Sequence, residues 1–207
     1  AALMISVSTL LSSGRLNLIT SSSFPPSSKI AFLASLISSS GSSFITWEEL
    51  RDLGRPDHLH TLLCINQHKQ EDTDTKITDV AIDYIRREEP DFLFLYLGET
   101  DEVGGHSVGW MSETYMGSVH KAMGCIEKVY ENLPEGYTLI VTADHGGHGR
   151  SHGENIPEDM TIPICFCGPK FEAGKALEGV SIKDIAVTVT KLLEVPKEKE
   201  WEGTARC

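Results

Sequence analysis

The sequence predicts an α/β fold with a mostly parallel sheet and helices on both faces. Apolar runs short enough for single strands, such as residues 92–97, alternate with longer segments whose apolar residues recur at helical spacing. The strand-like runs are continuous rather than alternating, which is typical of strands that are covered on both faces. Polar, glycine-rich loops follow two of these runs, at the place where parallel sheets gather their binding groups.

The elements expected after residue 47 follow this alternation. We expect strands over residues 62–65, 92–97, 138–143 and 162–167, helices over 77–88 and 113–132, and loops over 69–76 and 98–109. Ser112 is the expected N-cap of the second helix. A last helix should begin near Ser181, with Asp184 completing a capping box, and should end before Pro196.

The first 47 residues differ from the rest in composition. They contain fifteen serines, and their only charged residues are Arg15 and Lys29. Buried strands joined by serine-rich loops and a poorly ordered leader both fit this composition. We therefore describe residues 1–47 as an atypical, serine-rich N-terminal part and residues 48–207 as a metal-binding α/β unit, together forming a single domain.

Charge and cysteine usage narrow the classes of function. The formal net charge of −12 argues against binding to nucleic-acid polymers. No apolar run reaches the roughly 18 residues of a membrane helix, so we expect no membrane partner. The five cysteines are scattered without a disulfide framework, which favours a cytoplasmic setting and leaves secretion open. The oligomeric state is left open.

The loop after residues 138–143 concentrates metal-binding side chains. Residues 144–153 contain Asp144, His145, His148, His152 and four glycines. Carboxylate and imidazole are ligands that zinc prefers, and glycines permit the turns that let such ligands converge. The alternative is a glycine-rich surface turn in which histidines happen to cluster.

A second cluster follows residues 92–97. Asp101 and His106 again offer a carboxylate and an imidazole just beyond the carboxyl end of a strand. Two such loops on parallel strands would meet at one edge of the sheet. Trp110 and Tyr115, which come next, either pack in the core or line a pocket.

These motifs resemble those of a known superfamily. Asp101-Glu-Val-Gly-Gly-His106-Ser-Val-Gly109, then Thr142-Ala-Asp144-His145-Gly-Gly and His152-Gly153, are similar to the metal-binding half of the alkaline phosphatase superfamily. Within it, the type I phosphodiesterase/nucleotide pyrophosphatase family is the nearest match. The resemblance implies an alkaline-phosphatase-like fold and two divalent metal ions, most often zinc, with manganese or magnesium as alternatives.

The resemblance also implies ligands and chemistry. Asp101, His106 and His152 would bind one metal, and Asp144 and His145 the other. His148 could replace His152 or could hold a carboxylate beside the site. A hydroxyl nucleophile would attack a phosphoester and form a covalent phospho-enzyme intermediate, with one cation lowering the pKa of the nucleophile and the other activating water.

Two departures from the family pattern stand out. The spacing from Asp101 to His106 is five residues, one more than usual. The chain has no aspartate before Asp52, and its only candidate nucleophile is Ser23, which precedes Phe24-Pro25. We therefore expect an incomplete second metal site and poor catalysis, from either an altered N-terminal part or a fragment of a longer enzyme.

The sequence thus favours a metal-dependent phosphoester hydrolase of the phosphodiesterase/nucleotide pyrophosphatase type, acting on a small phosphorylated substrate such as a nucleotide or phosphodiester. A truncated or non-catalytic metal-binding domain is the alternative, and a metal-free structural domain is a third. A sulfatase would need a cysteine-x-proline-x-arginine motif, which is absent, and a mutase would need a basic cluster for its phosphorylated acid, which the sequence does not offer.

Overall fold

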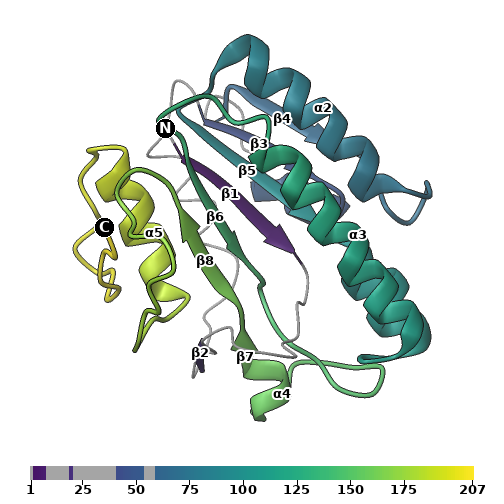
Figure 1. The fold of residues 1–207 in the computed structure, drawn as a ribbon. Coiled ribbons are helices and arrows are strands. Elements are labelled where there is room, and N and C mark those ends of the chain that lie inside the picture. Colours follow the sequence, from purple (N-terminus) through teal and green to yellow (C-terminus); the bar gives the residue numbers. More distant parts are fainter. Residues whose placement is uncertain (1, 8–18, 21–40, 54–58) are drawn as a thin grey trace.

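The computed structural model describes residues 2–7, 19–20, 41–53 and 59–207. Within these residues the main sheet has six strands, in the order β4-β3-β5-β1-β6-β8 (Figure 1). The strands are β1 (Ala2–Val7), β3 (Gly41–Ile45), β4 (Thr61–Cys64), β5 (Phe92–Leu97), β6 (Thr138–Thr142) and β8 (Ile164–Cys167). Neighbours are parallel except for β8, which runs antiparallel to β6. A separate antiparallel pair joins β2 (Ile19–Thr20) to β7 (Thr161–Ile162).

Helices cover both faces of this sheet, and the side chains of β5 divide between them. Leu93, Leu95 and Leu97 join a core with α2 (Thr73–Glu88) and α3 (Glu113–Tyr130) on one face. Phe92, Phe94 and Tyr96 join a second core with α5 (Lys183–Leu192) on the other (Figure 1). All six residues of β5 are buried. The predicted fold class, a mostly parallel sheet between helices, is confirmed.

Two strands of the serine-rich part belong to the main sheet. β1 lies between β5 and β6 and pairs with both in parallel. β3 pairs with β4 and β5. The described parts of residues 1–47 are thus mainly strands, and the two descriptions of this segment stay predictions.

The predicted element boundaries are mostly right, with two corrections. The expected loop over 69–76 is too long, because α2 begins at Thr73, where the Glu99 carboxylate accepts hydrogen bonds from the Thr73 backbone N–H and hydroxyl. The expected strand over 162–167 is divided at Pro163, which has no N–H to donate. Ser112 caps α3 as predicted, accepting from Tyr115 N, and Asp184 accepts from Ser181 N at the start of α5.

The shorter helices are the 3₁₀-helix η1 (Glu48–Leu53), the π-helix η2 (Thr100–His106) and α4 (Pro157–Met160). Among the described residues, no helix is both long and apolar enough to span a bilayer.

Candidate metal centre

The candidate site lies at the carboxyl edge of the sheet, in the loops that follow β5 and β6. The β1 strand lies between these two strands, with Val7 beside Leu97 and Ser6 beside Thr142. The strands are parallel, so both loops leave the sheet at the same edge, as the sequence predicts. The first loop carries Asp101 and His106, and the second carries Asp144, His145 and His152.

The first loop is not the irregular segment that the sequence predicts, because Thr100–His106 forms a π-helix. The Gly109 N–H donates to the Gly104 carbonyl, a bond across five residues. Such a turn accommodates one residue more than an α-helical turn and is frequent at functional sites. The five-residue spacing therefore still brings His106 over Asp101, with Nε2 at 3.6 Å from Oδ1.

Asp101 is the centre of this arrangement. Its Oδ1 atom is buried and has no hydrogen-bond partner among the described residues. His106 Nε2 and His152 Nε2 lie 3.6 and 3.9 Å from this oxygen, which is too far for a direct hydrogen bond. Burial raises the pKa of the Asp101 carboxyl, although the nearby histidines oppose the shift. A buried carboxylate without a hydrogen-bond partner is unfavourable, and a bound cation would offset this cost.

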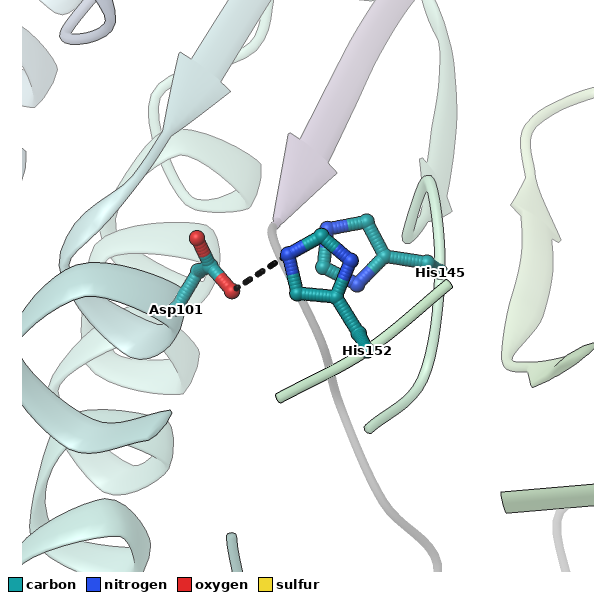
Figure 2. A group of neighbouring side chains, drawn as sticks. All are labelled: Asp101, His145 and His152. Atoms are coloured by element: carbon teal, nitrogen blue, oxygen red, sulfur yellow. Dashed lines mark ion pairs between the residues drawn. The ribbon is translucent and has the colours of Figure 1, made fainter. Parts of the chain in front are cut away.

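Asp101, His145 and His152 converge closely enough to share one ion. One ligand atom from each lies within 4.8 Å of the others. Figure 2 shows the Asp101 carboxylate directed toward His152, with the His145 ring behind it. The His145 and His152 rings stack with centroids 3.8 Å apart. Burial, followed by the neighbouring His145 and His106, lowers the pKa of His152 and so favours the neutral imidazole that binds metals.

Two backbone carbonyls select the tautomers of the other histidines. His145 Nδ1 lies 2.7 Å from the Gly146 carbonyl, and His106 Nδ1 lies 3.2 Å from the Arg150 carbonyl. A carbonyl can only accept, so each Nδ1 carries the proton and each neutral ring keeps its Nε2 lone pair. Such outer hydrogen bonds orient metal-binding histidines. The residues present therefore fit a divalent metal ion.

The closest group of ligand atoms contains residues from both of the ligand sets that the resemblance implies. His145, expected beside Asp144 at a second metal, joins Asp101 and His152. His106 lies at the margin of this group, its ring centroid 5.1 Å from that of His152. Asp144 Oδ1 lies 3.7 Å from His145 Nε2, and the Tyr96 hydroxyl lies 3.5 Å from Asp144 Oδ2. The division into two metals stays a prediction.

His148 holds a carboxylate, which is one of the two roles left open for it, and the carboxylate is that of Asp159, a residue that the sequence analysis did not single out. Its Nδ1 donates to Asp159 Oδ1 at 2.8 Å, and this hydrogen bond raises the pKa of His148. Asp159 is buried, and it also accepts from the Glu154 N–H, while its carbonyl accepts from Gly146 N. Asp159 thus anchors the second loop. Nothing in the sequence marked it, because it lies in a polar stretch without a motif. Ser23 lies outside the described residues.

The fold and this group of possible metal ligands agree with the resemblance to the alkaline phosphatase superfamily. The sequence model for "Type I phosphodiesterase / nucleotide pyrophosphatase" matches residues 20–157, more than half of the chain. The chain belongs to this family.

Individual relatives and solved structures are similar to parts of the chain. The chain is 28% identical over 135 residues to the 2,3-bisphosphoglycerate-independent phosphoglycerate mutase of Clostridioides difficile, an alignment that covers 62% of this chain and 26% of the mutase. Among solved structures it resembles a candidate sulfatase from Bacteroides thetaiotaomicron, with TM-score 0.55, 14% identity, and coverage of 84% of this chain and 55% of the other. It also resembles the phosphoglycerate mutase of Leishmania mexicana, with TM-score 0.53, 14% identity, and coverage of 79% and 36%. The chain thus spans about a quarter of the length of the curated relatives it matches.

Proposed function

We propose that this chain carries the metal site of a phosphoester hydrolase of the phosphodiesterase/nucleotide pyrophosphatase type, acting on a small phosphorylated substrate such as a nucleotide. One observation supports this most strongly: Asp101 Oδ1 is buried without a hydrogen-bond partner among the described residues, at the point where His145 and His152 converge. Family membership supplies the reaction class.

In this proposal Asp101, His145 and His152 hold one divalent ion, with zinc the first candidate and manganese or magnesium the alternatives. His106 and Asp144 complete the group, either on the same ion or on a second one. A bound divalent ion would lower the pKa of a hydroxyl and balance charge on phosphoryl oxygens. The protein's own contribution is to fix the ligands: the Gly146 and Arg150 carbonyls hold the His145 and His106 rings in the tautomer with a free Nε2.

The proposed reaction also needs a hydroxyl nucleophile. Ser23 is its only named candidate, and it lies outside the described residues. A non-catalytic metal-binding domain therefore stays as the alternative within the same proposal, and it would keep metal binding without turnover.

A phosphomutase is the second candidate, because the curated relatives include phosphoglycerate mutases. Such an enzyme must hold a phosphorylated carboxylic acid with cationic side chains. The two loops at the site contain a single arginine or lysine, Arg150. Its Nε donates to the His106 carbonyl at 2.9 Å, so this group already serves to join the loops. Hydrolysis therefore remains the favoured reaction.

The test combines metal content with two assays on the same preparations. Zinc per chain, hydrolysis of bis-p-nitrophenyl phosphate and isomerisation of phosphoglycerate are measured for the parent chain and for His145→Ala. His120→Ala is the matched control, since His120 is exposed on α3. Zinc with hydrolysis, both lost in His145→Ala only, supports the hydrolase. Zinc with isomerisation supports the mutase, and zinc without turnover supports the non-catalytic domain. A parent chain without zinc contradicts all three.

A further inference from the structure

Trp110 lies between the two loops of the metal centre. It comes four residues after the end of the π-helix at His106, and its side chain is buried. The edge-on contacts of its ring reach His106 of the first loop and His152 of the second, with centroids 5.3 and 5.9 Å away. Its backbone N–H donates to the Gly149 carbonyl at 2.8 Å. Trp110 therefore contacts both halves of the ligand group without being a ligand.

Two glycines, one from each loop, leave room for this ring. A Cβ atom on Gly105 would lie 2.6 Å from Trp110 Cη2, and one on Gly147 would lie 2.2 Å from Cε2. Neither glycine has the positive φ that would itself demand glycine. The reason for glycine at both positions is thus the close approach of the indole, which is packed between the two backbones.

Helix α3 supports the ring from behind. Tyr115 and Val119, both buried, form a small core with Trp110. The Trp110 Nε1 atom is buried and has no hydrogen-bond partner among the described residues. A hydrogen bond from the indole therefore does not explain why a tryptophan occupies this position. The size and flat shape of the ring, which reaches both loops, do explain it.

We propose that Trp110 is a positioning residue that sets the distance between the two ligand loops, and so between Asp101 and the pair His145 and His152. This inference rests on the proposed metal-binding function. It also gives the extra residue of the first loop a role, because the π-helical turn closed by Gly109 and Gly104 delivers Trp110 to the gap between the loops.

The proposal predicts a coupled effect on metal affinity. Trp110→Leu removes most of the ring, and the loops lose their spacer. Gly147→Ala forces the ring out of place by adding a methyl group at its face. Each change should weaken zinc binding by about 10-fold or more, the scale seen when groups that support metal ligands are altered. When Trp110 is replaced by leucine, the methyl group of Gly147→Ala no longer meets the indole ring. The variant with both changes should therefore lose far less zinc affinity than the product of the two single losses.

The experiment is a zinc titration of the whole chain against a competing chelator, with tryptophan emission recorded in the same samples. Gly124→Ala is the matched glycine control, because a Cβ there meets nothing within 4 Å. Trp110→Phe serves if the leucine variant fails to fold. Zinc should change the emission of the parent chain and of Trp201→Phe, but not of the Trp110 variants. This emission change would show that zinc binds beside Trp110, and the affinities of the variants then test its positioning role.

The outcomes separate this proposal from the one on which it rests. If the parent chain binds zinc and the Trp110 variants bind it equally well, the positioning role is overturned and the metal site stands. Additive losses in Trp110→Leu and Gly147→Ala would also overturn it. A parent chain that binds no zinc would overturn both proposals.

Discussion

Replacing Asp101 with asparagine should stabilise the metal-free protein and abolish its response to zinc. The buried Oδ1 has no hydrogen-bond partner among the described residues, and burial raises the pKa of this carboxyl. Leaving a buried polar group unpaired costs about 1–3 kcal/mol, and more when it is charged. At pH 8, with a chelator present, Asp101→Asn should therefore raise the free energy of unfolding by about 1–2 kcal/mol, because the amide keeps the shape without the charge.

Zinc should reverse this order of stability. An ion that binds only the folded state adds about 2.7 kcal/mol when its concentration is 100 times the dissociation constant. In urea unfolding with chelator, Asp101→Asn should unfold at a higher urea concentration than the parent chain. With zinc, the parent chain should unfold at the higher concentration. Asp83→Asn is the control, because Asp83 is exposed on α2, and it should match the parent chain in both conditions. A variant that is less stable than the parent chain without metal, or that gains as much from zinc, would refute the reasoning.

Three further predictions concern the scaffold. Burial, and then the neighbouring Glu99, raise the pKa of Asp74 from 3.8 to about 7, against the opposing pull of Lys121 and the Gly98 and Glu99 N–H groups. The folded protein thus keeps a proton that the unfolded chain has lost, so the contribution of Asp74 to stability is fully present below about pH 4 and is lost as pH rises through about 7. Asp74→Asn should remove a fall on the order of 2 kcal/mol between pH 5 and pH 8, read from urea unfolding at both values, and an unchanged pH profile would contradict this. Ser112→Ala removes the side chain that caps α3 and should cost about 1 kcal/mol, measured by the same method, with Ser112→Asp as the variant that retains the cap. Leu95→Ala empties a fully buried position in the core under α2 and α3 and should cost about 2–5 kcal/mol; a loss below 1 kcal/mol would mean that this core is not packed as described.

Local signals in the sequence were enough to predict several elements closely. The apolar run Phe92–Leu97 is a strand with the predicted bounds, because a short, continuous and aromatic-rich apolar run favours a strand buried on both faces. Ser112 caps α3 as predicted, and Asp184 accepts from the Ser181 N–H, which is one of the two hydrogen bonds of the predicted capping box. Such signals are local because capping depends on residues only a few positions apart. Metal-binding side chains after two parallel strands were expected to meet, and Asp101 and His152 do.

Features that depend on distant contacts could not be read from the sequence. The π-helix over Thr100–His106 depends on how the loop packs, with Gly104 against Tyr115 and Gly105 against Trp110. The antiparallel direction of β8 follows from the path of the chain after the second loop, and a strand's apolar pattern does not encode its direction.

The grouping of ligands is also a tertiary property. His145 is adjacent to Asp144 in sequence, yet its ring stacks on His152 and faces Asp101. Only the relative position of the two loops decides this. Asp159, which anchors the second loop, was not marked by the sequence, and for Trp110 the sequence left a core role and a pocket role open.

Zinc content per chain is the measurement that tests the central claim most directly. The parent chain, His145→Ala and His120→Ala would be loaded with zinc, freed of weakly bound metal and analysed by mass spectrometry. The geometry around Asp101 predicts about one tightly bound zinc per chain in the parent and the control, and none in His145→Ala. A parent chain without zinc, or a His145→Ala variant that keeps it, would contradict the account.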